Sequence, residues 1–119
     1  NLVELMPDTV VSESDMVVKE RFGLEANAFN ALVYYGPDSN MDAAELLLID
    51  MKDTSQKETV TDAIQKRIDY QKTCFEGYGV DQMELINQAK TVVYGHYVLF
   101  IVSKDSQPAR DAFAEAVTK

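Results

Sequence analysis

Apolar residues form two continuous runs, one in each half of the chain. Residues 97–102 (YVLFIV) are apolar at each position, and so are residues 46–49 (LLLI). A strand buried on one face alternates apolar and polar positions, so an unbroken run predicts a strand covered on both faces. Gly95-His96 separates the second run from another segment rich in β-branched residues. We therefore predict a hairpin over residues 90–103, with residues 97–102 as a central strand.

Helical spacing is clearest between Lys57 and about Glu76, where Val60, Ile64, Ile68 and Phe75 lie on one side. Ser12 and Asp15 have capping-box spacing and predict the start of an earlier helix. That earlier helix is predicted to follow Ser12 and to end at about residue 22. The remaining predicted elements are helices over residues 81–89 and 109–117, and strands over residues 27–35 and 44–51. This order predicts an α+β fold with a four-stranded antiparallel sheet made of two hairpins and packed with helices.

The two halves share short matching segments in the same order, which predicts an internal αββα repeat about a pseudo-twofold axis. Strand and turn chemistry alone also produces such coincidences, so both interpretations stay open. The matches are Phe22-Gly23 with Tyr78-Gly79, Tyr34-Tyr35-Gly36 with Val93-Tyr94-Gly95, and residues 48–53 with residues 100–105.

A chain of 119 residues fits a single domain over residues 1–119, with residues 1–11 expected to be a tether. Twenty acidic against 11 basic residues give a net charge of −9, which repels phosphate backbones and makes nucleic acid an unexpected partner. No segment reaches the about 20 apolar residues of a membrane helix. The chain begins at Asn1, so we expect membrane contact only through an N-terminal anchor that was removed.

Asp38, Asn40 and Asp42 place oxygen ligands at alternate positions, as a calcium loop does. The pattern departs from such a loop at Ala43, where a glycine is needed, and at Ile49, where a bidentate acid is needed. We therefore favour hydrogen-bonded turns there and expect no metal and no cofactor.

His96 is the one histidine of the chain and could serve as a base or a ligand. A small hydrolase or metal-dependent enzyme using His96 with Asp38 or Asp42 is thus the alternative function, although a turn residue is the simpler interpretation. Cys74 is expected to be a half-buried, inert thiol.

Arg67 and Gln71 lie four residues apart beside the apolar stripe of the long helix, where they could hold an anionic ligand. With Tyr78 and Tyr97 they form the candidate ligand-binding set. The competing interpretation is that Arg67 pairs with Asp62, Asp69 or an acid elsewhere and covers apolar surface with its stem.

Three of the predicted strands are apolar on both faces, whereas few helices are available to cover them. If the helices all lie on one side, an apolar sheet face is left to meet a partner, through self-association or docking of another protein. If the terminal elements wrap round, that face is covered.

Several motifs resemble a family of uncharacterised domains from Gram-positive bacteria, mostly predicted lipoproteins or exported proteins. They lie within residues 15–117 and are Phe22-Gly23, Tyr34-Tyr35, residues 40–45, the series Arg67, Gln71, Phe75, Tyr78 and Gln82, Gly95-His96-Tyr97 and residues 102–105. The resemblance implies an extracytoplasmic, surface-anchored or secreted protein. We favour a non-enzymatic binding module for a protein, peptide or cell-wall component, which could also form a homodimer.

Overall fold

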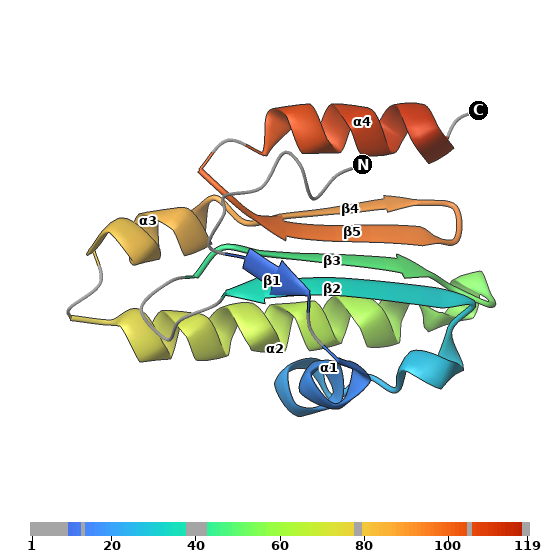
Figure 1. Ribbon diagram of the computed structural model, residues 1–119, viewed down its shortest axis with the longest axis horizontal. Helices are drawn as coiled ribbons and strands as arrows, with labels where there is room; N and C mark the ends of the chain where they lie inside the picture. Colours follow the sequence, from blue (N-terminus) through green and yellow to red (C-terminus); the bar gives the residue numbers. More distant parts are fainter. Residues whose placement is uncertain (1–9, 13, 38–42, 78–79, 105, 118–119) are drawn as a thin grey trace.

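The computed structural model describes residues 10–12, 14–37, 43–77, 80–104 and 106–117, which form four α-helices and one five-stranded sheet (Figure 1). The strands are β1 (Val10–Ser12), β2 (Ala31–Pro37), β3 (Glu45–Asp50), β4 (Lys90–Tyr94) and β5 (Tyr97–Val102). The helices are α1 (Asp15–Phe22), α2 (Lys57–Phe75), α3 (Val80–Asn87) and α4 (Gln107–Val117), with short 3-10 turns at Ala26–Ala28 and Thr54–Gln56.

The sheet has the strand order β1-β2-β3-β5-β4, and every neighbouring pair is antiparallel. The four predicted strands are β2, β3, β4 and β5, so the α+β fold and its two hairpins are confirmed. The strand β5 lies between β3 and β4, and all of its residues after Tyr97 are buried. Its unbroken apolar run therefore marks an interior strand, as predicted.

A short additional strand, β1, extends the sheet at its β2 edge. Val11 pairs with Gly36 and Ser12 with Tyr35. The prediction that Ser12 is the N-cap of the first helix is therefore wrong, because Ser12 belongs to a strand. That N-cap is Ser14, whose carbonyl accepts hydrogen bonds from the amides of Val17 and Val18. The expected tether included Val10 and Val11, which instead belong to β1; residues 1–9 lie outside the described residues.

One side of the sheet, which we call the α2 face, is covered by α1 and α2, and α3 packs against the end of α2. Alternate strand residues point to this side because successive side chains leave a strand on opposite faces. Gly23 ends α1 with a φ of 71°, a left-handed conformation that glycine adopts without strain. The core of this face includes Phe22, Tyr34, Leu47, Ile49, Ile64, Val98 and Phe100.

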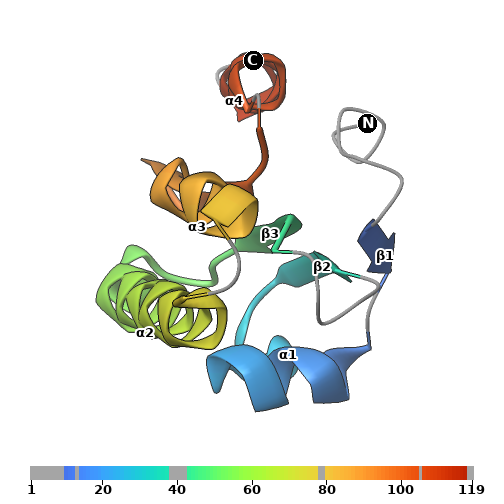
Figure 2. The same cartoon turned by 90° about the vertical axis from the view of Figure 1, so that its left-hand side faces the viewer.

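The opposite side, the α4 face, carries α4, which lies across the sheet from α1 and α2 (Figure 2). This helix packs on β4 and β5. Leu46, Leu99 and Ile101 are buried there beneath Ala109 and Phe113. Thus the helices do not all lie on one side: the C-terminal helix crosses over and covers part of the second face.

The predicted repeat is unconfirmed. The two hairpins, β2-β3 and β4-β5, do meet between β3 and β5, as a twofold axis through the sheet requires. However, such an axis would place the helix after each hairpin on the same face, whereas α2 and α4 lie on opposite faces. The strand order of the two hairpins is compatible with the repeat but does not confirm it.

None of the helices in the described ranges is both long enough and apolar enough to cross a bilayer.

Candidate functional site

A charged residue opens the most buried strand of the hairpin β2-β3. Glu45 is the first residue of β3 and is only 1% exposed. It lies two residues before Leu47 and four before Ile49, so its side chain points to the α2 face with theirs. A carboxylate removed from water in this way requires hydrogen-bonding or charged partners.

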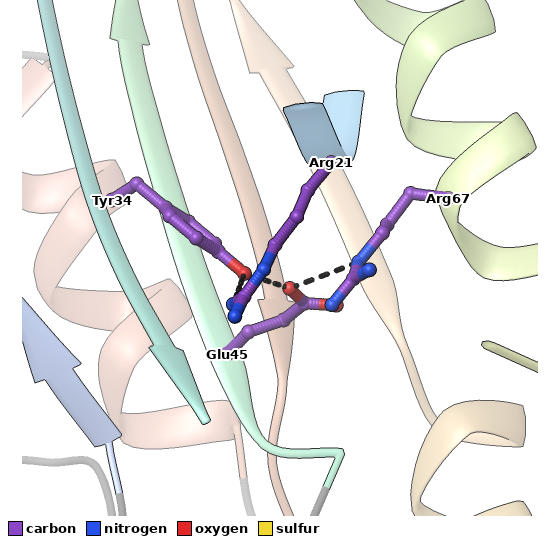
Figure 3. Close-up of polar contacts among 4 residues, drawn as sticks. All are labelled: Arg21, Tyr34, Glu45 and Arg67. Carbon is purple, nitrogen blue, oxygen red and sulfur yellow. Dashed lines mark hydrogen bonds and ion pairs between the residues drawn. The ribbon is translucent and has the colours of Figure 1, made fainter. Parts of the chain in front are cut away.

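Tyr34 and Arg67 are these partners (Figure 3). The Tyr34 hydroxyl donates a hydrogen bond of 2.5 Å to Glu45 Oε1. Arg67 Nε, on α2, lies 3.3 Å from Glu45 Oε1 and 3.2 Å from Oε2. The Arg67 guanidinium also lies over the Phe22 ring, 5.7 Å from its centroid, so the cation is held by both charge and aromatic contact.

Arg21 of α1 completes the group, which we call the polar cluster: Arg21, Tyr34, Glu45 and Arg67. Arg21 Nη1 donates to the Tyr34 hydroxyl at 3.0 Å. Both side chains lie over Gly36, where an added Cβ would stand 2.5 Å from Arg21 Nη1 and 2.8 Å from the Tyr34 oxygen. A side chain at position 36 would have to displace these two groups, so Gly36 leaves the space that they occupy.

The electrostatics of the polar cluster favour structure over acid-base chemistry. Burial, followed by the charge of Glu45 and its hydrogen bond, raises the pKa of Tyr34 well above the ordinary 10.0 of a phenol. Arg67 and Arg21 oppose this rise less strongly. Tyr34 consequently remains a hydrogen-bond donor at neutral pH, and the Glu45 carboxylate is engaged by Tyr34 and Arg67. The cluster joins α1, β2, β3 and α2.

The structure separates the candidate ligand-binding set. Arg67 is 6% exposed and Gln71 is 7% exposed, both on the buried side of α2. Arg67 pairs with an acid distant in sequence, Glu45, which was the competing interpretation, although neither acid named beforehand is its partner. Tyr97 alternates with Val98 and so belongs to the α4 face, away from Arg67. Tyr78 lies outside the described residues.

His96 lies in the turn between β4 and β5, next to Gly95, whose φ is 60°. His96 Nδ1 is 2.6 Å from Asp50 Oδ1, and its ring centroid is 4.2 Å from that of Tyr97. Asp50 is the last residue of β3, at the opposite end of that strand from Glu45. The length of β3, roughly 17 Å, thus separates His96 from the start of that strand.

The candidate calcium ligands and the carboxylates of the enzyme alternative, Asp38, Asn40 and Asp42, lie outside the described residues. Within the described ranges no three His, Cys, Asp or Glu side chains converge as metal ligands do. Cys74 is half-buried on α2, as expected.

The α4 face has a second feature, a strip over β2 and β3 that we call the open half: Ala31, Val33, Tyr35 and Leu48. Val33 pairs with Leu48 across the two strands, and Tyr35 pairs with Leu46. Val33 is 43% exposed, Ala31 is exposed, and Tyr35 and Leu48 are half-buried, whereas Leu46 is buried. The apolar surface beneath α4 thus continues beyond the helix to the side of the sheet nearest β1.

Sequence reasoning missed Arg21 and the pairing role of Glu45. A usable signal was present for Glu45, because it stands in phase with Leu47 and Ile49 at the start of an apolar run. Arg67 is likewise in phase with Val60 and Ile64 on α2. An acid and a base at core positions of adjacent elements predict a buried pair.

No curated protein and no solved structure matched the chain. A family model matches residues 5–103, from before β1 to just beyond the end of β5, and α4 lies outside the matched residues. The resemblance inferred from the motifs extended further, to residue 117. The match covers most of the chain, which therefore belongs to the family described as a domain of unknown function, DUF4358.

Proposed function

We propose that this chain is a non-enzymatic binding module that engages a protein or peptide through the open half of the α4 face. The observation that carries the proposal is the exposure of Val33, 43%, in a cross-strand row with half-buried Leu48. Isolated exposed apolar residues are ordinary, but a contiguous row continuous with a core marks a contact surface.

The polar cluster supports a non-enzymatic role. Its carboxylate is enclosed by Tyr34 and Arg67, and Glu45 has almost no exposure to solvent. A general acid or base needs access to the atom from which it takes, or to which it gives, a proton. Glu45 lacks that access, so the cluster supports the scaffold that carries the open half.

The test uses two substitutions that add the same charge on opposite sides of the molecule. Val33→Lys places a cation in the open half, whereas Met16→Lys places one on α1, where Met16 is 82% exposed. A partner isolated from the source cells should bind the native chain and M16K equally and bind V33K at least about tenfold more weakly. Hydrogen exchange with the purified partner should protect β2 and β3. Equal binding by both variants, or protection confined to α1 and α2, would overturn the proposal. The same pair of variants tests a cell-wall polymer.

The proposal also places the module outside the cytoplasm, on the cell surface or secreted. Its support is the likeness of the Phe22-Gly23, Tyr34-Tyr35 and Gly95-His96-Tyr97 motifs to those of predicted lipoproteins of Gram-positive bacteria. Protease added to intact source cells should digest the protein while a cytoplasmic marker survives. Digestion that requires lysis would contradict this location.

A further inference from the structure

One edge of the sheet is a regular strand with a single partner. The strand β4 comes last in the sheet order, and among the described residues it pairs only with β5. Its register with β5 runs unbroken along the whole strand, which contains no proline and no glycine. At the opposite edge β1 has three residues, and Pro37 at the end of β2 has no amide to donate. Short strands and prolines blunt an edge, so β4 is the edge left able to pair.

The turn of the hairpin determines which peptide groups of β4 point outward. A two-residue loop is closed by a residue pair that exchanges both hydrogen bonds, here Tyr94 and Tyr97. Bonded and non-bonded pairs alternate along antiparallel strands, so every second residue of β4 bonds to β5 and the residues between do not. The residues between are Thr91 and Val93. Their amides and carbonyls therefore point away from the sheet.

A second copy of β4 satisfies these outward groups when it runs antiparallel and a twofold axis passes through Val92. In that register Thr91 lies opposite Val93 of the second copy, and Val93 lies opposite its Thr91, so each outward amide meets a carbonyl. A shift of two residues in either direction would leave one of the two residues opposite a position outside β4. The strand therefore matches its own edge fully in one register.

The side chains of β4 agree with this register. Val92 meets its own counterpart on the α4 face, in a pair without hydrogen bonds, where side chains approach most closely. Lys90 lies opposite Tyr94 of the second copy, so its ammonium group meets no like charge and its stem covers a ring. Tyr94 is 47% exposed in the single chain. The strand contains no acid, so the acidity of the chain does not oppose pairing within the strand itself.

We propose that two copies of this chain join through β4 into one continuous antiparallel sheet of ten strands, five from each copy. A twofold axis perpendicular to the sheet keeps its faces distinct, so both α4 helices lie on the same face. The open half lies over β2 and β3, away from the joined edge, and stays accessible in each copy. The dimer is thus independent of the proposed function and presents the open half twice on one side.

Thr91→Pro tests the dimer with little change to the internal ladder of the chain. Because the Thr91 amide points outward, proline removes a hydrogen bond to the second copy and none to β5. Sedimentation equilibrium should show the native chain passing from monomer to dimer as its concentration rises. T91P should dimerise at least about tenfold more weakly, whereas Met16→Lys, at an exposed position of α1, should dimerise normally. Circular dichroism of T91P should match that of the native chain.

Engineered cysteines test the register without a proline, in a Cys74→Ser background that leaves no other thiol. The Cβ atoms of the two copies of position 92 should lie about 5 Å apart, close to the separation in a disulfide. Val92→Cys should therefore give a linked dimer on mild oxidation. Lys90→Cys is the matched control, because its two copies are four residues apart along the strands, at least about 13 Å. Mixing Lys90→Cys with Tyr94→Cys should link the two different chains.

Several results would overturn the dimer. One is a native chain that stays monomeric at every concentration measured. Another is dimerisation that T91P retains at full strength, which would place the contact elsewhere. Loss of the dimer in V33K but not in T91P would make the open half the contact between copies. Linking of K90C alone as fast as V92C would exclude the register. The partner-binding test with V33K does not involve β4, so the proposed function succeeds or fails independently of these results.

Discussion

The two faces of the sheet depart from the rule of apolar side chains inside and polar side chains outside in opposite ways. On the α2 face the Glu45 carboxylate is only 1% exposed and contacts Tyr34 and Arg67. Arg21 in turn donates a hydrogen bond to the Tyr34 hydroxyl. On the α4 face an apolar residue, Val33, is 43% exposed. Polarity alone therefore does not decide burial in this protein.

The difference follows from which helices cover each face. The α2 face receives α1 and α2, and α2 alone buries six side chains. The α4 face has α4 over β4 and β5, and this helix buries two. Where helices cover the sheet, even charged groups are enclosed and must be paired; where coverage is partial, apolar groups stay exposed. The α2 face therefore holds the fold together, whereas the open half of the α4 face is the surface on which the proposed binding role rests.

The largest expected effect comes from removing the buried acid. Glu45→Ala leaves the Arg67 guanidinium buried without its counter-ion and the Tyr34 hydroxyl without its acceptor. Breaking a buried pair in this way costs about 3–5 kcal/mol. Urea denaturation followed by circular dichroism should show this loss in the free energy of unfolding.

A double variant sharpens the result. Replacing both members, in Glu45→Ala with Arg67→Met, removes the uncompensated charge and should cost clearly less than the sum of the single changes. Additive costs, or a loss below about 1 kcal/mol for Glu45→Ala, would mean that solvent reaches the pair and that the α2 face is not closed.

A smaller and more local effect is expected on the α4 face. Phe113 is one of the two buried residues of α4 and packs near Leu99 and Ile101. Phe113→Ala should cost about 3 kcal/mol. Native-state hydrogen exchange should show the loss first in the amides of α4, while those of α2 stay protected.

Phe22→Ala is the matched change on the α2 face. Phe22 stacks edge-to-face on Tyr34, with centroids 5.2 Å apart, and belongs to the larger core. Its removal should lower protection throughout the sheet. An equal loss of protection in α2 and in α4 on Phe113→Ala would instead show that the two faces unfold as one unit. That result would contradict the contrast between them.

An intermediate effect is expected from the hydroxyl in the polar cluster. Tyr34→Phe removes a donor to Glu45 and an acceptor for Arg21, at a cost of about 1–3 kcal/mol at neutral pH. Equilibrium unfolding in urea measures it.

The difference in unfolding free energy between the native chain and Y34F should shrink as the pH rises above 10.0. The pKa of Tyr34 in the folded chain is raised above its unfolded value, near 10.0, because burial and Glu45 favour the neutral phenol. Its contribution to stability is therefore complete below pH 10.0 and declines as the pH rises toward the folded pKa. The native chain should lose stability faster than Y34F above that pH. Parallel curves for the two proteins would contradict an enclosed Tyr34.

The elements of the fold were largely predictable because they depend on local pattern. Residues 97–102 identify an interior strand by continuous apolarity, and Gly23 ends α1 as expected. The strand β1 was missed because three residues carry too little pattern, and its pairing depends on the exposed edge of β2. The side of the sheet that α4 covers was equally hidden, since helices on either face show the same periodicity.

The polar cluster was only partly predictable. Arg67 and Gln71 were identified from their place beside an apolar stripe, but the choice between a ligand and an internal acid depends on Glu45, 22 residues earlier. Arg21 lies on the short helix α1, whose sequence does not indicate toward which strand the Arg21 side chain points. This side chain reaches Tyr34 across the space that Gly36 leaves. Such contacts arise from tertiary packing, and local spacing does not encode them.

The smallest expected effect is the sharpest comparison of the two faces, because the same substitution can be made on each. Val33 on the α4 face and Val98 on the α2 face are both strand residues, 43% and 1% exposed. Val98→Thr places a hydroxyl in the core and should cost about 1–3 kcal/mol. Val33→Thr should change the free energy of unfolding by less than about 0.5 kcal/mol, because water solvates the new hydroxyl.

Chemical denaturation of the two variants under identical conditions measures this difference. Similar losses for both would mean that Val33 is covered in solution and that the open half is closed in the isolated chain. A loss confined to V98T leaves apolar surface over β2 and β3 that the fold does not use.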